Sequence, residues 1–426
     1  MSSPATLAEW LAYLETLHPK AIALGLDRVQ QVHARLGVRP GCPVVTVGGT
    51  NGKGSTATFV ERMFSAGGYR TGLYTSPHLL AYNERVRIAG ALATDAELCA
   101  AFAAVEAVRR DTPLTYFEFG TLAAFWLFAR AELDAWVLEV GLGGRLDAVN
   151  VVDPDVAVVT TVAVDHTDFL GSTREAIGAE KAGIFRPGRP AICADADPPA
   201  SLVAKADAIG AKLTRIGVDF GYEAQGPQWR YFGPGGARYG LPHPALRGAH
   251  QIANAAAALA AIDTLRERLP VAMSAVREAL VGIELAGRFQ VLPGRPVTVL
   301  DVAHNPQAAR TLSDVLGTMG FHPRTLAVFG IMADKDIDAV IAAIARRVDV
   351  WLVAALPPPR GAGATLVAER LARSGVAADA IHAFASPGEA YTAARGLALE
   401  ADRIIVFGSF LTVAAALAQA SGRVKR

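Results

Sequence analysis

Short apolar segments recur along the first half of the chain, with helix-length stretches of mixed polarity between them. The segments cover residues 43–47, 135–140, 156–164 and 189–194. Nearly continuous apolar runs of this length are typical of strands buried on both faces. Between two of them, residues 55–68 place Phe59, Val60, Met63 and Phe64 on one face of a predicted helix. The alternation predicts a mostly parallel sheet with helical crossovers.

The pattern changes twice in the second half. Residues 213–246 are rich in Gly, Pro and aromatic residues, which predicts irregular or short-strand structure. Residues 251–269, rich in alanine and leucine, predict a strong helix. Leu292–Pro296 then indicates a boundary, after which a second α/β series begins. Its predicted strands lie within 297–302, 325–331, 349–356 and 403–409. We therefore predict two α/β domains, residues 1–292 and 297–426.

Composition and charge exclude several classes of protein. The 426 residues are 52% apolar and 19% charged, which argues against disorder. A formal net charge of +1 without long charged blocks gives no case for nucleic acid or a membrane surface. Cys42, Cys99 and Cys193 lie too far apart for a disulfide framework or a metal motif. No apolar run approaches the roughly 20 residues that span a bilayer, and the N-terminal residues lack a signal-peptide pattern. We expect a soluble cytoplasmic protein.

A glycine-rich turn joins the first predicted strand to the helix that follows it. Glycines allow tight backbone geometry, and the helix start offers N–H groups and a positive dipole end to an anion. Lys53 adds a charge, and the hydroxyl of Ser55 or Thr56 could assist phosphate or Mg²⁺ binding. The glycines are Gly48, Gly49, Gly52 and Gly54. Gly54 stands where the common nucleotide-loop signature has serine or threonine, so a typical GTPase or kinase fits poorly.

This departure belongs to a wider resemblance. GTNGKGS followed by YTSPHL resembles the Mur-ligase superfamily and, within it, the folylpolyglutamate synthase branch. Further motifs follow in the family's order: LGLDRV (24–29), TYFEFGTLAAF (115–125), LEVGLGGRLDAVN (138–150), DHTDFLG (165–171), EKAGIFRPG (180–188), AGRFQV (286–291), DVAHNP (301–306) and GSFLTV (408–413). The resemblance covers nearly the whole chain. It implies an N-terminal P-loop mononucleotide-binding ATPase domain, which also binds folate, and a C-terminal Rossmann-like glutamate ligase domain.

Three residues are candidate metal ligands. Glu139 interrupts an apolar strand near its C-terminal end, where ligands of parallel sheets collect. It is either a Mg²⁺ ligand or a glutamate satisfied by backbone N–H groups or Arg145. The resemblance favours the first role and adds Ser76 and His166 as further ligands. It implies two Mg²⁺ ions and ATP as co-substrate, and a monovalent cation is a further candidate.

Lys181 has two interpretations. Its sequence alone favours a solvated lysine on an amphipathic helix. The resemblance implies instead a lysine carbamylated by CO₂, which requires a neutral amine and therefore a depressed pKa. The catalytic candidates are thus Lys53, Glu139, His166 and Lys181.

The resemblance also assigns binding residues. Predicted ATP contacts are Thr50, Asn51, Gly52, Lys53, Gly54, Ser55, Asn254, Arg288 and Asp301. Predicted folate or pteroate contacts are Ile22, Ala23, Leu24, Thr115, Tyr116, Phe117, Glu118, Leu146, Asp147 and Ala148. His304 and Ser409 are predicted to position glutamate. On sequence alone, Asn254 equally suits a helix cap and Ser409 a loop hydroxyl.

The resemblance implies a reaction in which ATP phosphorylates a carboxylate and the amine of L-glutamate then displaces phosphate. The implied acceptors are dihydropteroate, giving dihydrofolate, and reduced folates, extended by γ-linked glutamates. The implied state is a monomer without nucleic acid or membrane partners. Two alternatives stay open at this point. One is a Mur-type ligase acting on a cell-wall precursor, and the other is a P-loop ATPase switch, which Gly54 disfavours.

Overall fold

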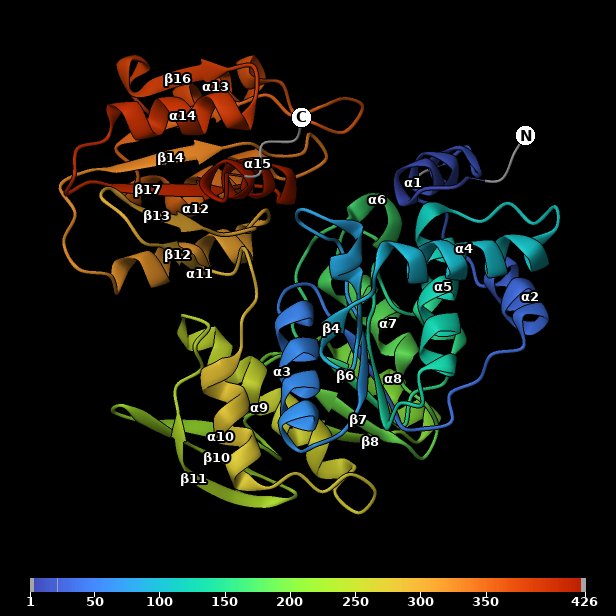
Figure 1. Cartoon of the computed structure of the whole chain (residues 1–426). Helices are drawn as coiled ribbons and strands as arrows, with labels where there is room; N and C mark the ends of the chain where they lie inside the picture. The colour runs from blue at the N-terminus through green and yellow to red at the C-terminus, as the bar shows by residue number, and fades with distance from the viewer. Residues whose placement is uncertain (1–3, 21, 423–426) are drawn as a thin grey trace. The chain divides into compact units, whose positions relative to one another are not determined.

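The computed structural model describes residues 4–20 and 22–422, and the chain divides into two compact units. Residues 1–245 and 251–283 form the first, and residues 246–250 and 284–426 form the second. Each unit is built around its own sheet, which is visible in Figure 1. Among the described residues, no helix combines the length and apolar character needed to cross a bilayer.

An eight-stranded sheet forms the centre of the first unit, with strand order β4-β3-β2-β5-β1-β6-β7-β8. Its strands are β1 (Val44–Gly48), β2 (Thr71–Tyr74), β3 (Val86–Ile88), β4 (Ala91–Leu92), β5 (Ala135–Glu139), β6 (Val156–Val159), β7 (Pro190–Cys193) and β8 (Lys212–Arg215). Six strands, β2, β5, β1, β6, β7 and β8 in their order across the sheet, run parallel to one another. β3 and β4 add an antiparallel edge next to β2. The central parallel strands β1, β5 and β6 are buried, as their apolar runs predict.

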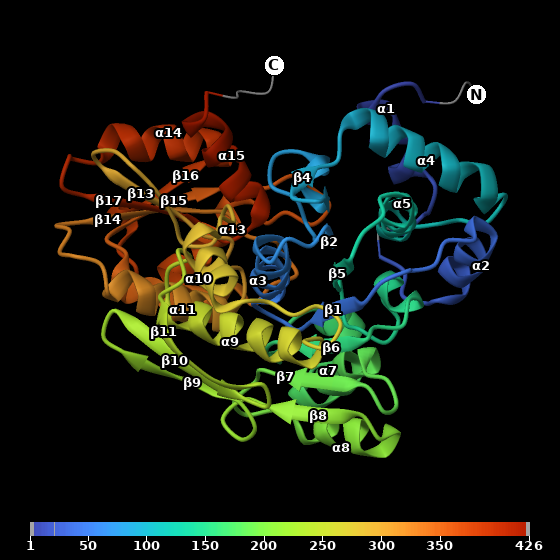
Figure 2. The same cartoon turned by 60° about the horizontal axis from the view of Figure 1, so that its bottom comes forward.

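The helices of the first unit include the crossovers between its parallel strands, and Figure 2 shows them with the bottom of the view in Figure 1 turned forward. They are α1 (Leu7–Thr16), α2 (Asp27–Leu36), α3 (Lys53–Ala66), α4 (Asp95–Arg109), α5 (Tyr116–Arg130), α6 (Thr167–Leu170), α7 (Arg174–Lys181), α8 (Ala200–Ile209), α9 (Ala249–Thr264) and α10 (Met273–Gly282). The face of β5 that carries Trp136 packs against α5, where Phe125 stacks on the indole and Phe128 meets its edge. Large rings buried in this way anchor the helix to the sheet.

The segment predicted to be irregular or short-stranded forms ordered structure after β8. It folds into an antiparallel three-stranded sheet, β9 (Gly221–Gln225), β10 (Gln228–Gly233) and β11 (Gly236–Pro242). The indole of Trp229 is fully buried and donates to the carbonyl of Pro242. Arg238 of β11 pairs with the buried Asp263 of α9, which fastens this small sheet to the helix.

The second unit has a six-stranded sheet with order β12-β13-β17-β14-β15-β16. Its strands are β12 (Gln290–Leu292), β13 (Val297–Leu300), β14 (Thr325–Phe329), β15 (Val350–Ala354), β16 (Ile381–Phe384) and β17 (Arg403–Phe407). Its helices are α11 (Pro306–Gly317), α12 (Ile337–Ile344), α13 (Ala364–Arg373), α14 (Pro387–Leu397) and α15 (Phe410–Ala420). All strands except β12 run parallel, and Phe329, Trp351 and Phe407 form its aromatic core.

The division of the chain differs from the one predicted at Leu292–Pro296. β12 pairs with β13 of the second sheet, so the residues from Glu284 onward belong to the second unit. The LPGRP segment is the connection between these two strands rather than a linker. Several strands also differ from expectation. β6 ends at Val159 rather than Val164, and β2, β3, β4, β12 and β16 were not predicted.

Candidate active site

The glycine-rich loop follows β1 directly and strongly favours glycine at two positions. Gly49 has a φ of 141°, and a Cβ there would lie 1.9 Å from the hydroxyl oxygen of Thr160. Gly52 has a φ of 88°, and its Cβ would lie 2.6 Å from the side-chain oxygen of Asn254. Gly52 is also the N-cap of α3, so no side chain caps the first-turn N–H groups of that helix from this position. Such a helix start suits an anion.

Hydrogen bonds fasten this loop to the residues that follow β6. The N–H of Thr50 donates to the carbonyl of Thr161 at 2.6 Å, and its hydroxyl donates to the carbonyl of Ala163 at 3.1 Å. The hydroxyl of Thr160 donates to the carbonyl of Asn51 at 2.6 Å. β6 ends early at this point, because Thr161 and Ala163 bond to the loop and the N–H of Val162 donates to Asp195 instead of a strand. Thr160 and Thr161 were missed as site residues, and a pair of hydroxyls inside an apolar run was their signal in the sequence.

Two lysines lie at the loop. The amine of Lys53 donates to the carbonyl of Thr50 at 3.1 Å, and that of Lys181 donates to the carbonyl of Gly49 at 2.8 Å. Lys181 is buried, with 3% of its surface exposed. Burial, followed by the charge of Lys53, lowers the pKa of Lys181 to about 7. The interpretation of a solvated lysine is therefore wrong, because α7 directs this side chain into the protein.

Glu139 ends β5 in register with Val47 of β1, the residue before the loop glycines. It is buried, and its Oε2 accepts from the N–H of Ser76 at 2.9 Å. Arg145 pairs with Glu180 at 2.7 Å, so it does not satisfy Glu139. Adjacent strand ends thus bring together the loop, a carboxylate and the turn that carries Ser76.

His166 is the N-cap residue of α6 and has a left-handed backbone with φ 53°. Its N–H donates to Asp165, and its Nε2 lies 3.9 Å from a carboxylate oxygen of Asp165. Within residues 4–20 and 22–422, no group of three or more His, Cys, Asp or Glu side chains is arranged to hold a metal. A buried carboxylate beside a serine still fits Mg²⁺, which usually takes one or two protein carboxylates and completes its shell with water and phosphate oxygens.

The three predicted folate segments lie together in the first unit. Arg28 donates to the carbonyl of Ala23 at 2.7 Å and pairs with Glu118 at 2.8 Å. The N–H of Gly25 donates to the carbonyl of Leu146 at 3.4 Å, which ties the N-terminal segment to the residues after β5. Of the remaining predicted members, Leu24 packs with the core beneath β6 and β7, and Ala148 is buried.

Thr115, Tyr116, Phe117 and Glu118 form the start of α5. Thr115 and Glu118 make a reciprocal capping box, which fixes the first turn of the helix. The rings of Phe117 and Tyr116 pack against the core, and Phe117 lies so close to Gly141 that a Cβ there would come within 2.5 Å of it. Packing therefore accounts for Phe117 more directly than stacking on a ligand does.

Asp147 accepts from the N–H groups of Leu142 and Val149 at 2.8 and 3.0 Å. Burial raises its pKa to about 7, although these hydrogen bonds and the charge of Lys53 oppose the rise. With a pKa of about 7, the carboxyl group of Asp147 can gain or lose a proton near neutral pH.

Asn254 and Ser409 have defined local partners. Asn254 lies inside α9, so the helix-cap interpretation is wrong, and its side-chain N–H donates to Gln251 at 3.0 Å. Ser409 is the N-cap of α15 rather than a loop hydroxyl, and its oxygen accepts from the N–H of Thr412 at 3.0 Å. Its buried position gives it a structural role whatever else it does.

Three other predicted residues lie in the second unit: Arg288 precedes β12, and Asp301 and His304 follow β13. Asp301 accepts from the N–H groups of Phe289 and Ala303, both at 2.8 Å, and burial raises its pKa. The guanidinium of Arg288 lies 5.3 Å from the ring of Phe410. The ring of His304 lies 6.4 Å from the same phenyl group, and its Nδ1 lies 2.9 Å from the carbonyl of Val302. Phe410 thus brings Arg288 and His304 to one place.

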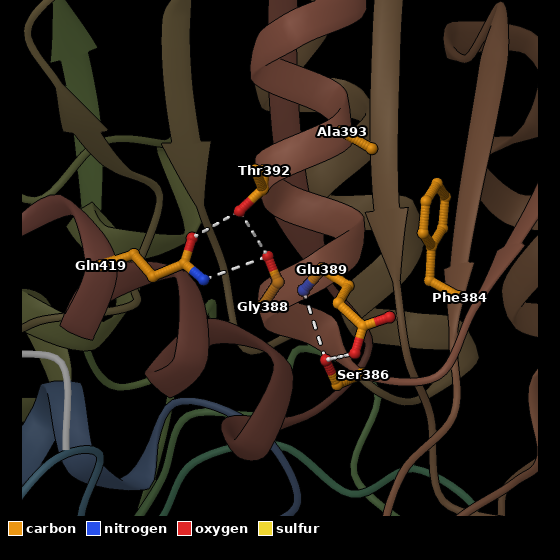
Figure 3. Close-up of a pocket in the computed structure, with 7 residues that line it drawn as sticks. All are labelled: Phe384, Ser386, Gly388, Glu389, Thr392, Ala393 and Gln419. Carbon is orange, nitrogen blue, oxygen red and sulfur yellow. Dashed lines mark hydrogen bonds between the residues drawn. The ribbon is translucent and has the colours of Figure 1, made fainter. Parts of the chain in front are cut away.

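A surface hollow beside α14 and α15 contains none of the predicted residues. Its polar groups mainly bond to one another, as when Gln419 donates to the carbonyl of Gly388 and Ser386 caps α14 (Figure 3). The hollow is lined by Phe384, Ser386, Gly388, Glu389, Thr392, Ala393 and Gln419.

Fold and site together define a mononucleotide-dependent ligase of two α/β units, and family comparisons agree. The Mur ligase middle domain model matches residues 47–262, and the Mur ligase glutamate ligase domain model matches residues 287–410. The dihydrofolate synthase/folylpolyglutamate synthase of Escherichia coli is 46% identical over 96% of this chain and 94% of its own length. That of Haemophilus influenzae is 39% identical, covering 97% of both chains. The chain therefore belongs to the Mur ligase family and, within it, to the dihydrofolate synthase/folylpolyglutamate synthases, and it is an ATP-dependent ligase.

Solved structures of related enzymes support the same family assignment. The E. coli protein FolC in complex with DHPP and ADP superposes with a TM-score of 0.93 at 44% identity, covering 99% of each chain. A bifunctional folylpolyglutamate synthase/dihydrofolate synthase with Mn, AMPPNP and L-glutamate bound has a TM-score of 0.91 at 45% identity, covering 98% of this chain and 99% of its own. These complexes agree with ATP as co-substrate and with a divalent metal ion, and the main prediction is supported over the cell-wall and switch alternatives.

Proposed function

We propose that this chain joins L-glutamate both to dihydropteroate and to reduced folates, with the first unit activating the carboxylate. One observation supports the placement of this chemistry above all. Val47 of β1 and Glu139 of β5 are register partners, so the nucleotide loop and a buried carboxylate leave the same edge of one sheet. Ligands of open parallel sheets collect at this edge.

The loop has two tasks in this proposal. The N–H groups at the start of α3 and the ammonium of Lys53 bind the outer phosphates of ATP and offset the charge that develops during transfer. The bonds from Thr160 and Thr161 hold the loop in shape before the nucleotide binds, so little reorganisation is needed. Thr50, Asn51, Gly54 and Ser55 share the phosphate contacts.

Ser76, Glu139 and His166 would hold the magnesium ions. When bound, Mg²⁺ reduces the repulsion between the substrate carboxylate and the γ-phosphate. The N–H of Ser76 donates to Oε2 of Glu139 and so fixes this carboxylate beside Ser76. Asn254, Arg288 and Asp301 stay predicted contacts of ATP.

The reaction proceeds in two steps. A carboxylate oxygen of the acyl substrate attacks the γ-phosphorus, the bond to the β-phosphate oxygen breaks, and ADP leaves. The amine of L-glutamate then attacks the acyl phosphate carbon, loses a proton and expels inorganic phosphate, leaving an amide. His304 and Ser409 are proposed to position the glutamate, in a segment that belongs to the glutamate ligase domain model.

Lys181 is proposed to react with CO₂. Its neutral amine attacks the carbon, and loss of one proton leaves a carbamate anion whose remaining N–H can still donate to the carbonyl of Gly49. The product replaces a cation next to Lys53 with an anion, so that two like charges become an attractive pair. Burial and Lys53 supply the lowered pKa that the reaction needs.

The acyl substrate is proposed to lie along the joined segments Ile22–Leu24, Thr115–Glu118 and Leu146–Ala148. Arg28 and the contact from Gly25 to Leu146 hold these segments in one place. We further propose that the chain works as a monomer in the cytoplasm, where ATP is available, without nucleic acid or membrane partners.

Mass spectrometry of the products tests this proposal. The full chain is incubated with Mg-ATP, L-glutamate and either dihydropteroate or tetrahydrofolate. We expect dihydrofolate from the first and tetrahydrofolate with added γ-linked glutamate from the second. Lys53→Ala and Glu139→Ala should each abolish both products, whereas Lys205→Ala, at an exposed position on α8, should not. If the wild-type chain forms only one product, the claim of two activities is wrong.

A further inference from the structure

Arg85 is a buried cation in the loop between Ser76 and β3. It ends the short helix η1 (Tyr82–Arg85), and only 9% of its surface is exposed. Its Nε donates to Nδ1 of His78 at 2.9 Å. Its guanidinium carbon lies 5.4 Å from the ring centre of Tyr82 and 5.6 Å from that of Tyr116.

The guanidinium has more hydrogen-bond donors than the chain satisfies. An arginine side chain carries five N–H donors, and the bond to His78 uses one. No acceptor for the other four is found within residues 4–20 and 22–422. The two rings offer π faces to the positive charge but no lone pairs in the plane of the guanidinium.

The nearest carboxylate in sequence cannot serve as the partner. Oε1 of Glu84 accepts from the N–H groups of Leu80 and Ala81, and Oε2 accepts from that of Leu79. These three bonds hold Glu84 within its own loop. The remaining donors of Arg85 are not among the buried unpaired atoms of the described residues, so they reach solvent. An anionic ligand at this place can accept from them.

The position of Arg85 indicates which ligand this is. His78 lies two residues after Ser76, a proposed metal ligand, and Tyr116 belongs to the proposed acyl-substrate segment. Because Arg85 donates to Nδ1 of His78, that ring is neutral and carries its proton on Nε2. The guanidinium therefore supplies the positive charge between the turn of Ser76 and the start of α5.

The two acyl substrates differ in charge. Dihydropteroate has a single carboxylate, which is the group that reacts. A folate ends in a glutamyl group with two carboxylates, of which only the γ-carboxylate reacts. The α-carboxylate of a bound folate needs a partner, and the planar fork of arginine matches a carboxylate.

We propose that Arg85 binds the non-reacting α-carboxylate of the folyl substrate and so is a specificity-determining residue for chain extension. This inference rests on the proposed function, because it assumes that folyl substrates bind along the segment of Tyr116. It assigns to Arg85 no part in the reaction of dihydropteroate.

The test compares the two acyl substrates in Arg85→Gln. Initial rates are measured with dihydropteroate and with tetrahydrofolate at saturating Mg-ATP and L-glutamate. We expect kcat/KM for tetrahydrofolate to fall about 10- to 100-fold, as for loss of a charged hydrogen bond, with kcat/KM for dihydropteroate changed less than about threefold. Arg87→Gln is the matched control, because Arg87 is two residues further along in β3 and forms no ion pair within residues 4–20 and 22–422. It should behave as wild type with both acceptors.

Binding measurements make the test independent of turnover. The wild-type chain should bind folic acid more tightly than its α-carboxamide derivative, and Arg85→Gln should bind the two equally. Arg85→Lys, which keeps the charge, should recover part of the preference. Circular dichroism confirms that each variant is folded.

Three results would overturn the proposal. Equal loss with both acceptors would mean that Arg85 only positions the loop through His78. No loss with either, or an undiminished preference of Arg85→Gln for the α-carboxylate, would mean that Arg85 does not contact the substrate. If the wild-type chain formed neither product, the proposed function would fail, and the binding comparison would still decide the role of Arg85.

Discussion

Replacement of Lys181 by methionine should stabilise the ligand-free protein in a pH-dependent way. The buried amine has a pKa of about 7, compared with an ordinary value of 10.5. This difference corresponds to roughly 5 kcal/mol of penalty for the charged form, and it is an upper limit because the native protein can relax around a charge. Methionine has a similar length and carries no charge, so Lys181→Met removes the penalty.

The sign of the effect follows from proton binding. Because the folded-state pKa lies below the unfolded-state pKa, the native protein binds fewer protons between pH 7 and 10.5. The destabilisation by Lys181 is therefore complete below pH 7 and fades as the pH rises towards 10.5. Lys181→Met also loses the hydrogen bond to Gly49, at a pH-independent cost of about 1 kcal/mol. We expect the variant to be about 2–4 kcal/mol more stable at pH 6.5, with an advantage roughly 2–3 kcal/mol smaller at pH 9.

Urea unfolding in CO₂-free buffer measures this difference. Tryptophan fluorescence reports mainly on the first unit, since Trp351 is the only one of the five tryptophans outside it. Lys205→Met, at an exposed site on α8, is the control and should match wild type at both pH values. An advantage of Lys181→Met that stayed constant between pH 6.5 and 9 would show that Lys181 has no depressed pKa, and the reasoning behind its carbamylation would fail with it.

Three further substitutions separate structural from chemical roles. Gly49→Ala forces a Cβ to within 1.9 Å of the Thr160 hydroxyl oxygen, so we expect strain of at least about 1–3 kcal/mol and loss of ATP binding by titration; normal affinity would contradict the loop geometry. Glu139→Gln keeps an acceptor for Ser76 but removes the charge, so ligase turnover should fall sharply at every Mg²⁺ concentration while thermal stability holds; an unchanged Mg²⁺ dependence would count against a metal role. Ser409→Ala should cost about 1 kcal/mol as a lost helix cap; only a rise in the KM for L-glutamate, beyond that loss of stability, would support a role in glutamate binding.

Much of the fold could be predicted because buried parallel strands have a simple pattern. The apolar runs at β1, β5, β7 and β14 match the strands to within one or two residues at each end. β16 was missed because its residues Ile381–Phe384 are mostly exposed or half-buried, so the sequence has no apolar run there. The domain boundary was misplaced because a proline and a glycine look the same in a linker as in the turn between β12 and β13.

The sequence predicted which residues form the candidate site, but it did not predict their burial or their hydrogen-bond partners. A lysine on an amphipathic helix looks solvated in sequence, and only the packing of α7 shows that Lys181 is buried. Likewise, the sequence suits Ser409 to a loop but does not show that its oxygen accepts from the N–H of Thr412 as a helix cap. Arg85 gave no signal at all, because an arginine after a glutamate is an ordinary surface pattern until its partners are known.

Several ionisable side chains of the first unit are buried near the candidate site. Lys181 and Asp147 both have pKa values moved to about 7 by burial, and Arg85 has donors without acceptors on the chain. Burial makes the charged forms of Lys181 and Asp147 costly in the ligand-free protein. A bound phosphate would give Lys181 an opposite charge, and a substrate carboxylate would give Arg85 an acceptor. A ligand that binds only the folded state stabilises the protein. Lys181→Met should therefore stabilise the empty protein and weaken its binding of anionic substrates.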